Sequence, residues 1–537
     1  MRTRRRARLG SMLIALAGLL SVLPIAADGQ TPKRGGTLRV AYGNEILGMD
    51  FYTTPGYEMA WVAMNVGCGL VSISTDGKFL PEAAESWQVS SDGLLYTFKL
   101  KKNLLFHDGS KVDAAAVKFT FDFVLDPANR SNMRQFLGSV HSVEVVDPHT
   151  VQIRLKQPYA FLMHVLAVYR MGMIIISPGV TQKYSPEDRR AGKPEALVGC
   201  GPFKLVEWAK GTHLVMDRFD KYFEPGLPYV DRIIIRVIKD PVTEMAAFKN
   251  GEVDFIASFS PEHVETLKAQ SPNAQIMTGK ETTPMLAQMR VTIPKDGKPM
   301  SKDRAPHPIF SDVRVRKAVG CYGIDRKEIV KIAFKGHATP WVGIIPPGTM
   351  DTVDVNNMCP YDQAKAKALL AEAGYGPQKP LTFELMTNTE KSVFNVIATV
   401  IKEQMTRIGV TANIRLVDKV TWMAAANQDG PWDMYVEDLL SLLTLDSNAY
   451  LSTTPAAWNH SRHTDTKVDD YYVRYARELD AAKRKAIAKE FVEYSADKLY
   501  WNTISGSPFY MVAQPWMKGY VYNAEFEVHF HQVWLDK

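Results

Sequence analysis

Beyond its N-terminal region the chain has no apolar run of about 20 residues, which is the length that a membrane-spanning helix needs. It also has no low-complexity segment and no short repeat. Cysteine is scarce, and the four positions show no close spacing of the kind that a zinc site uses: Cys68, Cys200, Cys321 and Cys359. The composition is that of an ordinary globular protein.

Motifs of common catalytic sites are missing too. There is no G-x-S-x-G, no H-E-x-x-H, no P-loop and no G-x-G-x-x-G. Two pairs of histidines are spaced so that each pair could bind a metal ion: His460 with His463, and His529 with His531. We expect instead that these side chains are hydrogen-bonded within the protein or exposed to solvent. Glu437 and Asp438 are adjacent, and neighbours on a strand point to opposite faces, so they are poorly placed as an acid–base pair. We therefore expect no enzyme, no cofactor and no metal.

The N-terminus is typical of a secretory signal. Five arginines in the first eight residues precede an apolar stretch at 12–25, and small residues precede possible cleavage points after Ala27 or Gly29. No cysteine follows that would take a lipid. The Sec and twin-arginine routes both stay open, with Sec favoured. Removing residues 1–27 changes the formal charge of +6 to 59 basic residues against 58 acidic ones, so nucleic acid is a poor partner.

Strand and helix patterns alternate along the mature chain, which is long enough for at least two domains, and this favours an α/β fold. Asp325 and Asp362 look like helix N-caps, with Glu328 completing a capping box and with Gly336 and Gly374 as stops. Alternating apolar residues predict strands at 38–42, 94–100, 151–155, 233–237 and 410–416. A longer periodic stretch before Gly409 predicts a helix at 393–408.

Six segments, in order, resemble one known family. They are GGTLRVA (35–41), DGKFLPEAAESWQVSSDGLLYTFKL (76–100), GCGPFKLVEW (199–208), FKNGEVDF (248–255), IFSDVRVRKAVGCYGIDRKEIV (309–330) and YDQAKAKALLAEAGY (361–375). The chain resembles the family 5 extracellular solute-binding proteins of bacterial ABC importers, which include dipeptide- and oligopeptide-binding proteins. Cys200 replaces the threonine of the family's GTGPF motif.

The resemblance implies a two-lobed periplasmic binding protein fold of type II, cluster C-like. Lobe I would comprise residues 30–283 and 508–537, with an extra subdomain inserted at about 77–195, and lobe II would comprise residues 284–507; residues 1–29 are the signal peptide. The chain would cross between lobes near 283–290 and 505–513. In an oxidising periplasm the cysteines allow three pairings or free thiols, and Cys321–Cys359 is the first candidate because both lie in lobe II.

The implied function is that of a periplasmic solute-binding subunit. A monomer without its own membrane span would capture a small polar solute between its lobes, close around it, and deliver it to an ABC permease and ATPase complex in the inner membrane. Two alternatives stay open: a true di- or oligopeptide-binding protein, and an adaptor that presents its ligand to a membrane receptor. A secreted hydrolase would need a nucleophile–base constellation, and none is present.

The candidate ligand residues follow mainly from that resemblance. In peptide-binding relatives a carboxylate anchors the ligand's amino group, and here its position falls on Ser441 or Leu442, with Asp438 or Asp446 as the alternative under a shifted alignment. The relatives' carboxylate-binding arginine falls near Asn388. Lys419 would bind an acid, Glu437 or Asp438 an amine or hydroxyls, and Trp422 would stack or belong to the core. The set is completed by two residues after the first strand, Tyr42 and Asn44, where α/β sheets place ligands.

Overall fold

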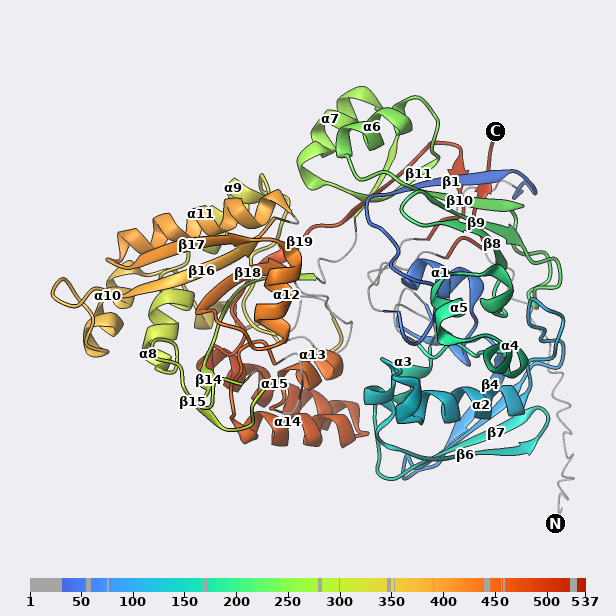
Figure 1. The fold of residues 1–537 in the computed structure, drawn as a ribbon, viewed down its shortest axis with the longest axis horizontal. Coiled ribbons are helices and arrows are strands. Elements are labelled where there is room, and N and C mark those ends of the chain that lie inside the picture. Colours follow the sequence, from blue (N-terminus) through green and yellow to red (C-terminus); the bar gives the residue numbers. More distant parts are fainter. Residues whose placement is uncertain are drawn as a thin grey trace, which may run out of the picture.

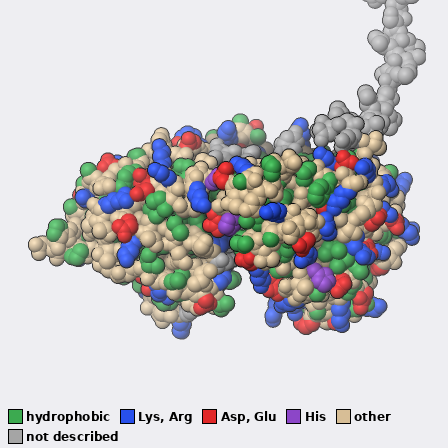
Figure 2. Space-filling model, turned by 90° about the horizontal axis from the view of Figure 1, so that it is seen from above, with side chains coloured by type: hydrophobic (Ala, Val, Ile, Leu, Met, Phe, Trp, Pro, Cys, Tyr) green, Lys and Arg blue, Asp and Glu red, His purple; other side chains and the backbone are tan. Residues whose placement is uncertain are grey.

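The protein consists of two lobes, which contain the lobe sheets described below (Figure 1). The computed structural model describes residues 31–54, 59–74, 77–167, 172–278, 283–298, 300–344, 349–351, 353–389, 391–438, 445–454, 456, 459–521 and 529–537. No helix within these ranges has the length and apolar character of a bilayer span. Side chains of both charge signs are interspersed over the face shown in Figure 2, in keeping with a mature chain close to neutral.

Lobe I is built on a seven-stranded sheet with β1 at its centre. In spatial order the strands are β12 (Gln275–Thr278), β20 (Tyr510–Ala513), β11 (Phe255–Phe259), β1 (Thr37–Tyr42), β10 (Arg232–Val237), β9 (His213–Arg218) and β8 (Phe203–Ala209). The parallel neighbours of β1 are β10 and β11. The helices of this part are α1 (Met59–Val66), α5 (Pro186–Arg190), α6 (Pro241–Lys249) and α7 (Val264–Gln270).

A four-stranded antiparallel sheet lies below that sheet in Figure 1. Its order is β4 (Ala84–Val89), β5 (Leu95–Leu100), β7 (Thr150–Leu155) and β6 (Val140–Asp147). It is accompanied by α2 (Ala114–Leu125), α3 (Leu162–Leu166), α4 (Pro178–Lys183) and the strand pair β2 (Val71–Ile73) and β3 (Phe79–Pro81). Alternate residues of β5 and β7 are buried, and α2 packs on β6 and β7, which is the pattern expected of a sheet covered on one face.

Lobe II contains a five-stranded sheet in the order β17 (Thr411–Val417), β16 (Thr382–Asn388), β18 (Met434–Asp438), β13 (Thr283–Met289) and β19 (Thr503–Ser507). Its helices are α8 (Val313–Arg316), α9 (Arg326–Ala333), α10 (Gln363–Glu372), α11 (Ser392–Arg407), α12 (Lys419–Asn427), α13 (Leu445–Ser452), α14 (Thr466–Arg477) and α15 (Ala481–Lys498). Two small strand pairs complete the fold: β14 (Thr292–Pro294) with β15 (Arg304–Pro306), and, at the C-terminus, β21 (Met517–Lys518) with β22 (Trp534–Leu535).

The helix ends follow the sequence signals, with one exception. Asp325 caps α9 by accepting from the backbone N–H of Lys327 and Glu328, and Gly336 follows the helix with φ +85°. Asp362 caps α10 in the same way. The capping box predicted from Glu328 is wrong: its carboxylate binds Arg407 at 2.7 Å instead, because α11 packs beside α9 and brings a guanidinium within reach.

The chain passes between the two large sheets twice, and the residues on either side of the two crossings are paired. In lobe I, Thr278 of β12 is paired with Tyr510 of β20; in lobe II, Thr283 of β13 is paired with Ser507 of β19. Both pairs are antiparallel. We propose that this double crossing is the hinge between the lobes, with Pro508 in its second arm.

Each lobe contains one disulfide: Cys68–Cys200 in lobe I and Cys321–Cys359 in lobe II. The pairing Cys321–Cys359, predicted first from the sequence, is present in the structure. Cys68–Cys200 joins the end of the segment after α1 to the GCGPF turn before β8, which explains why a cysteine occupies the threonine position of that motif.

The disulfides give a first testable prediction. Alkylation of the unreduced protein should label no thiol. Replacing Cys321 and Cys359 with serine should lower the free energy of unfolding by about 3–4 kcal/mol, because the bond closes a loop of 38 residues in the unfolded chain. Mass spectrometry and urea unfolding measure the two effects. Labelling of two or four cysteines in the folded, unreduced protein would contradict the pairing.

Candidate functional site

The first part of the candidate site lies at the hinge end of the lobe II sheet. Asp438, the last residue of β18, is paired with Met285, only two residues after the crossing at Thr283. β16 runs parallel to β18, so Asn388 ends at the same edge. α12 starts directly after β17 and places Lys419 there as well. The carboxyl ends of parallel strands are the usual place for ligands in α/β sheets.

Glu437 is the central group of this edge. Its side chain is 1% exposed, and its carboxylate accepts a hydrogen bond from the amide of Asn388 and forms an ion pair with the ammonium of Lys419 at 3.4 Å. Lys419 is only partly buried and also lies over the ring of Trp422, 4.8 Å from its centre. A buried carboxylate thus faces one fixed neutral donor and one long, movable cation.

Asp438 forms a separate ion pair with a lysine that was not among the residues predicted from the sequence. Its carboxylate is 2.6 Å from the ammonium of Lys391, and the side chain is 12% exposed. Lys391 follows the end of β16 by three residues, so its place at the carboxyl edge of a predicted strand was a usable signal. Because Glu437 and Asp438 are neighbours on one strand, the sheet separates the two ion pairs onto opposite faces.

Trp422 belongs to the core rather than to an open wall. It is 3% exposed and packs edge-to-face on Tyr435 at 5.3 Å, in a cluster with Met386 and Trp432. These side chains share the face of the sheet that α12 covers, whereas Leu385 and Val436 point to the face of α11. Of the two roles considered for Trp422, the structure shows a core contact, which fixes the height of α12 above the sheet.

The far end of α12 is held by a buried cluster of charges. The guanidinium of Arg462 donates to the carbonyl oxygens of Ala426 and Asn427, at 2.6 and 3.1 Å, and so satisfies the end of the helix. Asp429 lies behind it, fully buried, and binds Arg290 at 2.5 Å and Arg304 at 2.6 Å. Burial lowers the pKa of Arg290 to about 10. One carboxylate therefore compensates several guanidinium groups next to the helix that presents Lys419.

In lobe I, the ends of β1 and β11 face the same hinge. Phe259, the last residue of β11, is paired with Tyr510, which directly follows the second crossing. Tyr42 ends β1, is 2% exposed and packs against Trp61 at a ring distance of 5.0 Å. Asn44 is exposed and lies 3.5 Å from the Tyr42 hydroxyl. The two residues predicted from the strand end are thus together, with Trp61 as a partner that the sequence did not indicate.

Asp446 lies apart from the Glu437 edge. It is 2% exposed in α13, and its carboxylate accepts a hydrogen bond of 2.7 Å from the hydroxyl of Tyr159, which belongs to the inserted part of lobe I. Burial raises the pKa of Asp446 to about 7. The predicted positions Ser441 and Leu442 are outside the described residues.

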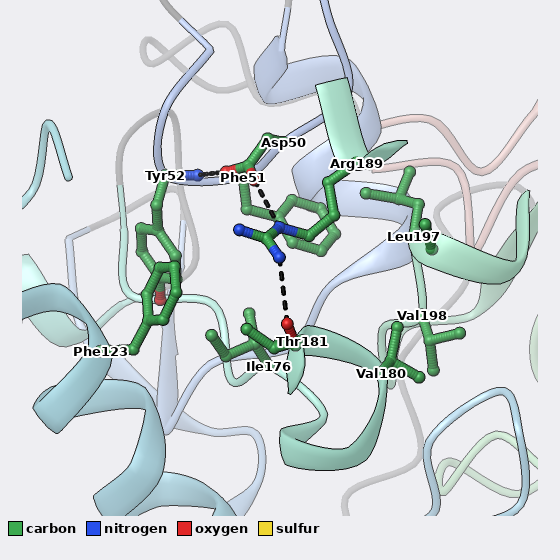
Figure 3. A pocket seen from close by; sticks show the side chains of 11 residues that line it. Asp50, Phe51, Tyr52, Phe123, Ile176, Val180, Thr181, Arg189, Leu197 and Val198 are labelled. Carbon is green, nitrogen blue, oxygen red and sulfur yellow. Dashed lines mark hydrogen bonds and ion pairs between the residues drawn. The ribbon is translucent and has the colours of Figure 1, made fainter. Parts of the chain in front are cut away.

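Figure 3 shows a hollow in lobe I that is unsuited to a solute. Asp50 and Arg189 form a buried ion pair at 2.7 Å on its wall, and Arg189 also donates to the carbonyl oxygen of Thr181 at 3.1 Å. The hollow measures about 20 Å³, close to the space that a single water needs. Its polar groups are already engaged with one another, so the pair serves the packing of the α4–α5 segment.

Comparison with known proteins identifies the family. The profile of the bacterial extracellular solute-binding proteins, family 5, matches residues 78–460. The chain belongs to this family. The resemblance noted from six sequence segments is therefore confirmed, and the protein is a solute-binding protein of the kind that serves ABC importers, in a family of binding proteins rather than enzymes.

Relatives support the same assignment over most of this solute-binding protein. It is 29% identical to the glutathione-binding protein GsiB of Escherichia coli K12 over 462 residues, which cover 84% of this chain and 85% of that protein. AgaA of A. tumefaciens R10, solved with agropinic acid, is 26% identical with a TM-score of 0.77, over 93% and 99% of the two chains. CtaP of Listeria monocytogenes has a TM-score of 0.80 at 22% identity, over 94% and 100%, and shows the fold alone. The expected two-lobed α/β fold is confirmed.

The buried charge cluster behind α12 yields a stability prediction. Asp429→Asn removes the carboxylate and leaves Arg290 and Arg304 buried without their counter-charge, so we expect the free energy of unfolding to fall by about 3–5 kcal/mol. The matched control is Asp303→Asn, since Asp303 binds Lys295 at 3.1 Å with both side chains exposed; it should cost less than about 1 kcal/mol. Urea unfolding at pH 7 compares them, and equal costs would show that the cluster is not stabilising.

Proposed function

We propose that this solute-binding protein captures, in the cleft between its lobes, a small polar solute that carries both an amino and a carboxylate group. The observation that carries the proposal is the buried carboxylate of Glu437 at the hinge end of the lobe II sheet, held by Asn388 and by the half-exposed Lys419. A permease and an ATPase of an ABC importer would receive the closed, loaded form.

Recognition would work by exchange of partners. The Lys419 side chain has a long flexible stem, so its ammonium can leave Glu437 and bind a carboxylate of the solute. An amino group of the solute then replaces the Lys419 ammonium beside Glu437, so the buried Glu437 carboxylate keeps a positive partner. Asn388 keeps the Glu437 carboxylate oriented throughout. Charge-assisted hydrogen bonds of this kind contribute roughly twice as much as neutral ones.

Closure would follow from contacts to both lobes. Asn44 and Tyr42 lie at the edge of lobe I that faces the hinge, and Glu437 lies at the edge of lobe II that faces the hinge. A solute that binds both edges stabilises the closed arrangement by the difference in its affinity for the two states. Motion about the paired crossings requires changes in only a few backbone angles.

Ordinary peptides fit this edge poorly. The resemblance to peptide-binding relatives puts the amine-anchoring carboxylate at Ser441 or Leu442 and the arginine near Asn388, so neither charged group is conserved in type here. Glu437 offers a carboxylate at another place. The names of two relatives agree with a modified amino-acid conjugate: glutathione has one amino and two carboxylate groups, and AgaA was solved with agropinic acid.

A ligand screen tests the proposal. We expect glutathione, agropinic acid or a related conjugate to raise the unfolding temperature, since a ligand at 100 times its Kd adds about 2.7 kcal/mol of stability. Ordinary dipeptides and tripeptides, with α-peptide bonds throughout, should bind weakly, because each lost charged partner costs about 2–5 kcal/mol. Glu437→Gln should weaken the best ligand by roughly ten- to a hundredfold in calorimetry.

Glu384→Gln is the matched control for that variant. Glu384 makes a carboxylate–arginine pair with Arg415 at 2.7 Å toward the opposite end of the same sheet, so its replacement should leave binding unchanged. Submicromolar binding of free peptides that is abolished by Asp438→Ala or Asp446→Ala would show that the anchor lies elsewhere and that the protein is a peptide-binding protein.

We also propose that the mature protein resides in the periplasm as a monomer. The basis is the arginine-rich and apolar N-terminal sequence together with the family. Intact mass of the exported protein should show the loss of the first 27 to 29 residues. A retained N-terminus, or a lipid-modified one, would contradict this location.

A further inference from the structure

We propose that the segment Tyr159–Phe161 of lobe I and the helices α13 and α14 of lobe II form a latch that holds the two lobes closed at a distance from the hinge. The latch is here defined by Tyr159, Ala160 and Phe161 on one side and Asp446, Tyr475 and Ala476 on the other. Figure 1 shows the two sides meeting beside α3, below the level at which β19 leads into the crossing.

Interactions of several kinds cross this seam within three consecutive residues of lobe I. The Tyr159 hydroxyl donates to the Asp446 carboxylate at 2.7 Å. The backbone N–H of Ala160 donates to the carbonyl oxygen of Ala476 at 2.8 Å. The ring of Phe161 stacks on that of Tyr475 at 5.1 Å. These are specific, directional contacts between groups that are about 290 to 315 residues apart in the chain, so they form only when the lobes come together.

Each side of the latch is held rigid by its own lobe. On lobe II, the Tyr475 hydroxyl donates to Asp351 at 2.7 Å, and Arg484 binds the same carboxylate at 3.4 Å while its guanidinium lies 5.5 Å from the Phe161 ring. On lobe I, the Tyr96 hydroxyl donates to the backbone carbonyl of Tyr159 at 3.5 Å. Groups that are already fixed lose little conformational entropy when they meet.

The seam has features of an interface that separates rather than of a permanent core. A cavity of about 160 Å³ runs along it, so the two surfaces are not closely packed throughout. Its lining comes from both lobes: Gln135, Phe136 and Gln157 from lobe I, and Tyr472, Val473 and Arg477 from lobe II. Tyr159 and Tyr472, whose hydroxyls donate to the Asp446 carboxylate, line this cavity, so water can reach these groups as soon as the lobes part.

A distance measurement on the ligand-free protein tests the latch without any solute, so its outcome is separate from that of the proposed function. Spin labels on Val146→Cys in β6 and Lys485→Cys in α15, both exposed positions, report the separation of the lobes. Tyr159→Phe removes one hydroxyl, and Phe161→Ala removes the stacked ring. We expect each to raise the ratio of open to closed molecules by roughly tenfold.

Tyr494→Phe is the matched control. Its hydroxyl also donates to an aspartate, Asp465 at 2.6 Å, but both residues belong to lobe II. It should leave the distance distribution unchanged. Unchanged distributions in Tyr159→Phe and Phe161→Ala, with unfolding curves like that of the parent, would overturn the proposal.

Acidity gives a second, independent measurement. The groups that face Asp446 are tyrosines: the hydroxyls of Tyr159 and Tyr472 donate to its carboxylate, and Tyr475 lies close enough for its charge to interact with it. Burial raises the pKa of Tyr472 and of Tyr475, so both stay neutral where Asp446 titrates. In the closed state the pKa of Asp446 is raised to about 7, whereas a solvated carboxyl has a pKa near 4. The closed state therefore binds the proton more tightly, so the contribution of this proton to closure is fully present below about pH 4 and is lost as pH rises from about 4 to about 7.

We expect the closed fraction of the spin-labelled protein to increase from pH 8 to pH 5. Asp446→Asn keeps an oxygen that accepts from Tyr159 and cannot ionise, so it should abolish the dependence. A pH dependence of the same size in Asp446→Asn, or its absence in the parent, would overturn the role of Asp446 in the latch.

Discussion

The double crossing between the sheets is the constraint on which the rest of the structure depends. Its two segments are antiparallel neighbours in both lobes, Thr278 beside Tyr510 and Thr283 beside Ser507. A pair of connected strands can bend, but it resists sliding and large rotations of one lobe against the other. It also decides which edge of each sheet faces the other lobe. Because β1 and β11 in lobe I and β16 and β18 in lobe II run toward these crossings, their carboxyl ends come to the same region.

Two buried carboxylates of lobe II, Asp429 and Glu437, have counter-charges of different kinds. Asp429 has no exposed side-chain surface and binds Arg290 and Arg304, whose guanidinium groups are themselves almost fully buried. Breaking such a pair leaves an uncompensated buried charge, so these groups are structural. Glu437 differs because its cation, Lys419, is on a flexible stem and half exposed. Only a counter-ion of this second kind can be exchanged for a ligand at low cost.

In the mechanism proposed above, the hinge and the latch control closure from two different places. The hinge sets the path of the motion, whereas the seam around Tyr159 and Asp446 sets the relative free energy of its end states. The solute edge lies with the hinge, and the latch lies on α13 and α14, which follow the candidate site in the chain. Because the latch residues do not belong to the proposed solute site, changes in the latch can alter the fraction of closed molecules without changing which solute is bound.

By itself, the sequence determined the family, the α/β class and the main helix ends. Asp325 and Asp362 were identifiable as caps and Gly336 as a stop because capping depends on residues a few positions apart. Cys321–Cys359 was identifiable as a candidate because both residues fall in one lobe of the family fold. The end of the first strand put Tyr42 and Asn44 among the site candidates, whereas Asn388 and Glu437 came from the resemblance to peptide-binding relatives.

Tertiary structure alone decided what those candidates contact. Glu328 binds Arg407 of another helix instead of closing its own capping box, Trp422 packs into the core, and Lys391 binds Asp438. Asp446 joins a tyrosine nearly three hundred residues away. The physical reason is the same in each case: a local pattern fixes backbone conformation over a few residues, whereas the partner of a charged or aromatic side chain is set by which distant segments the packed sheets and helices bring within about 3 to 5 Å.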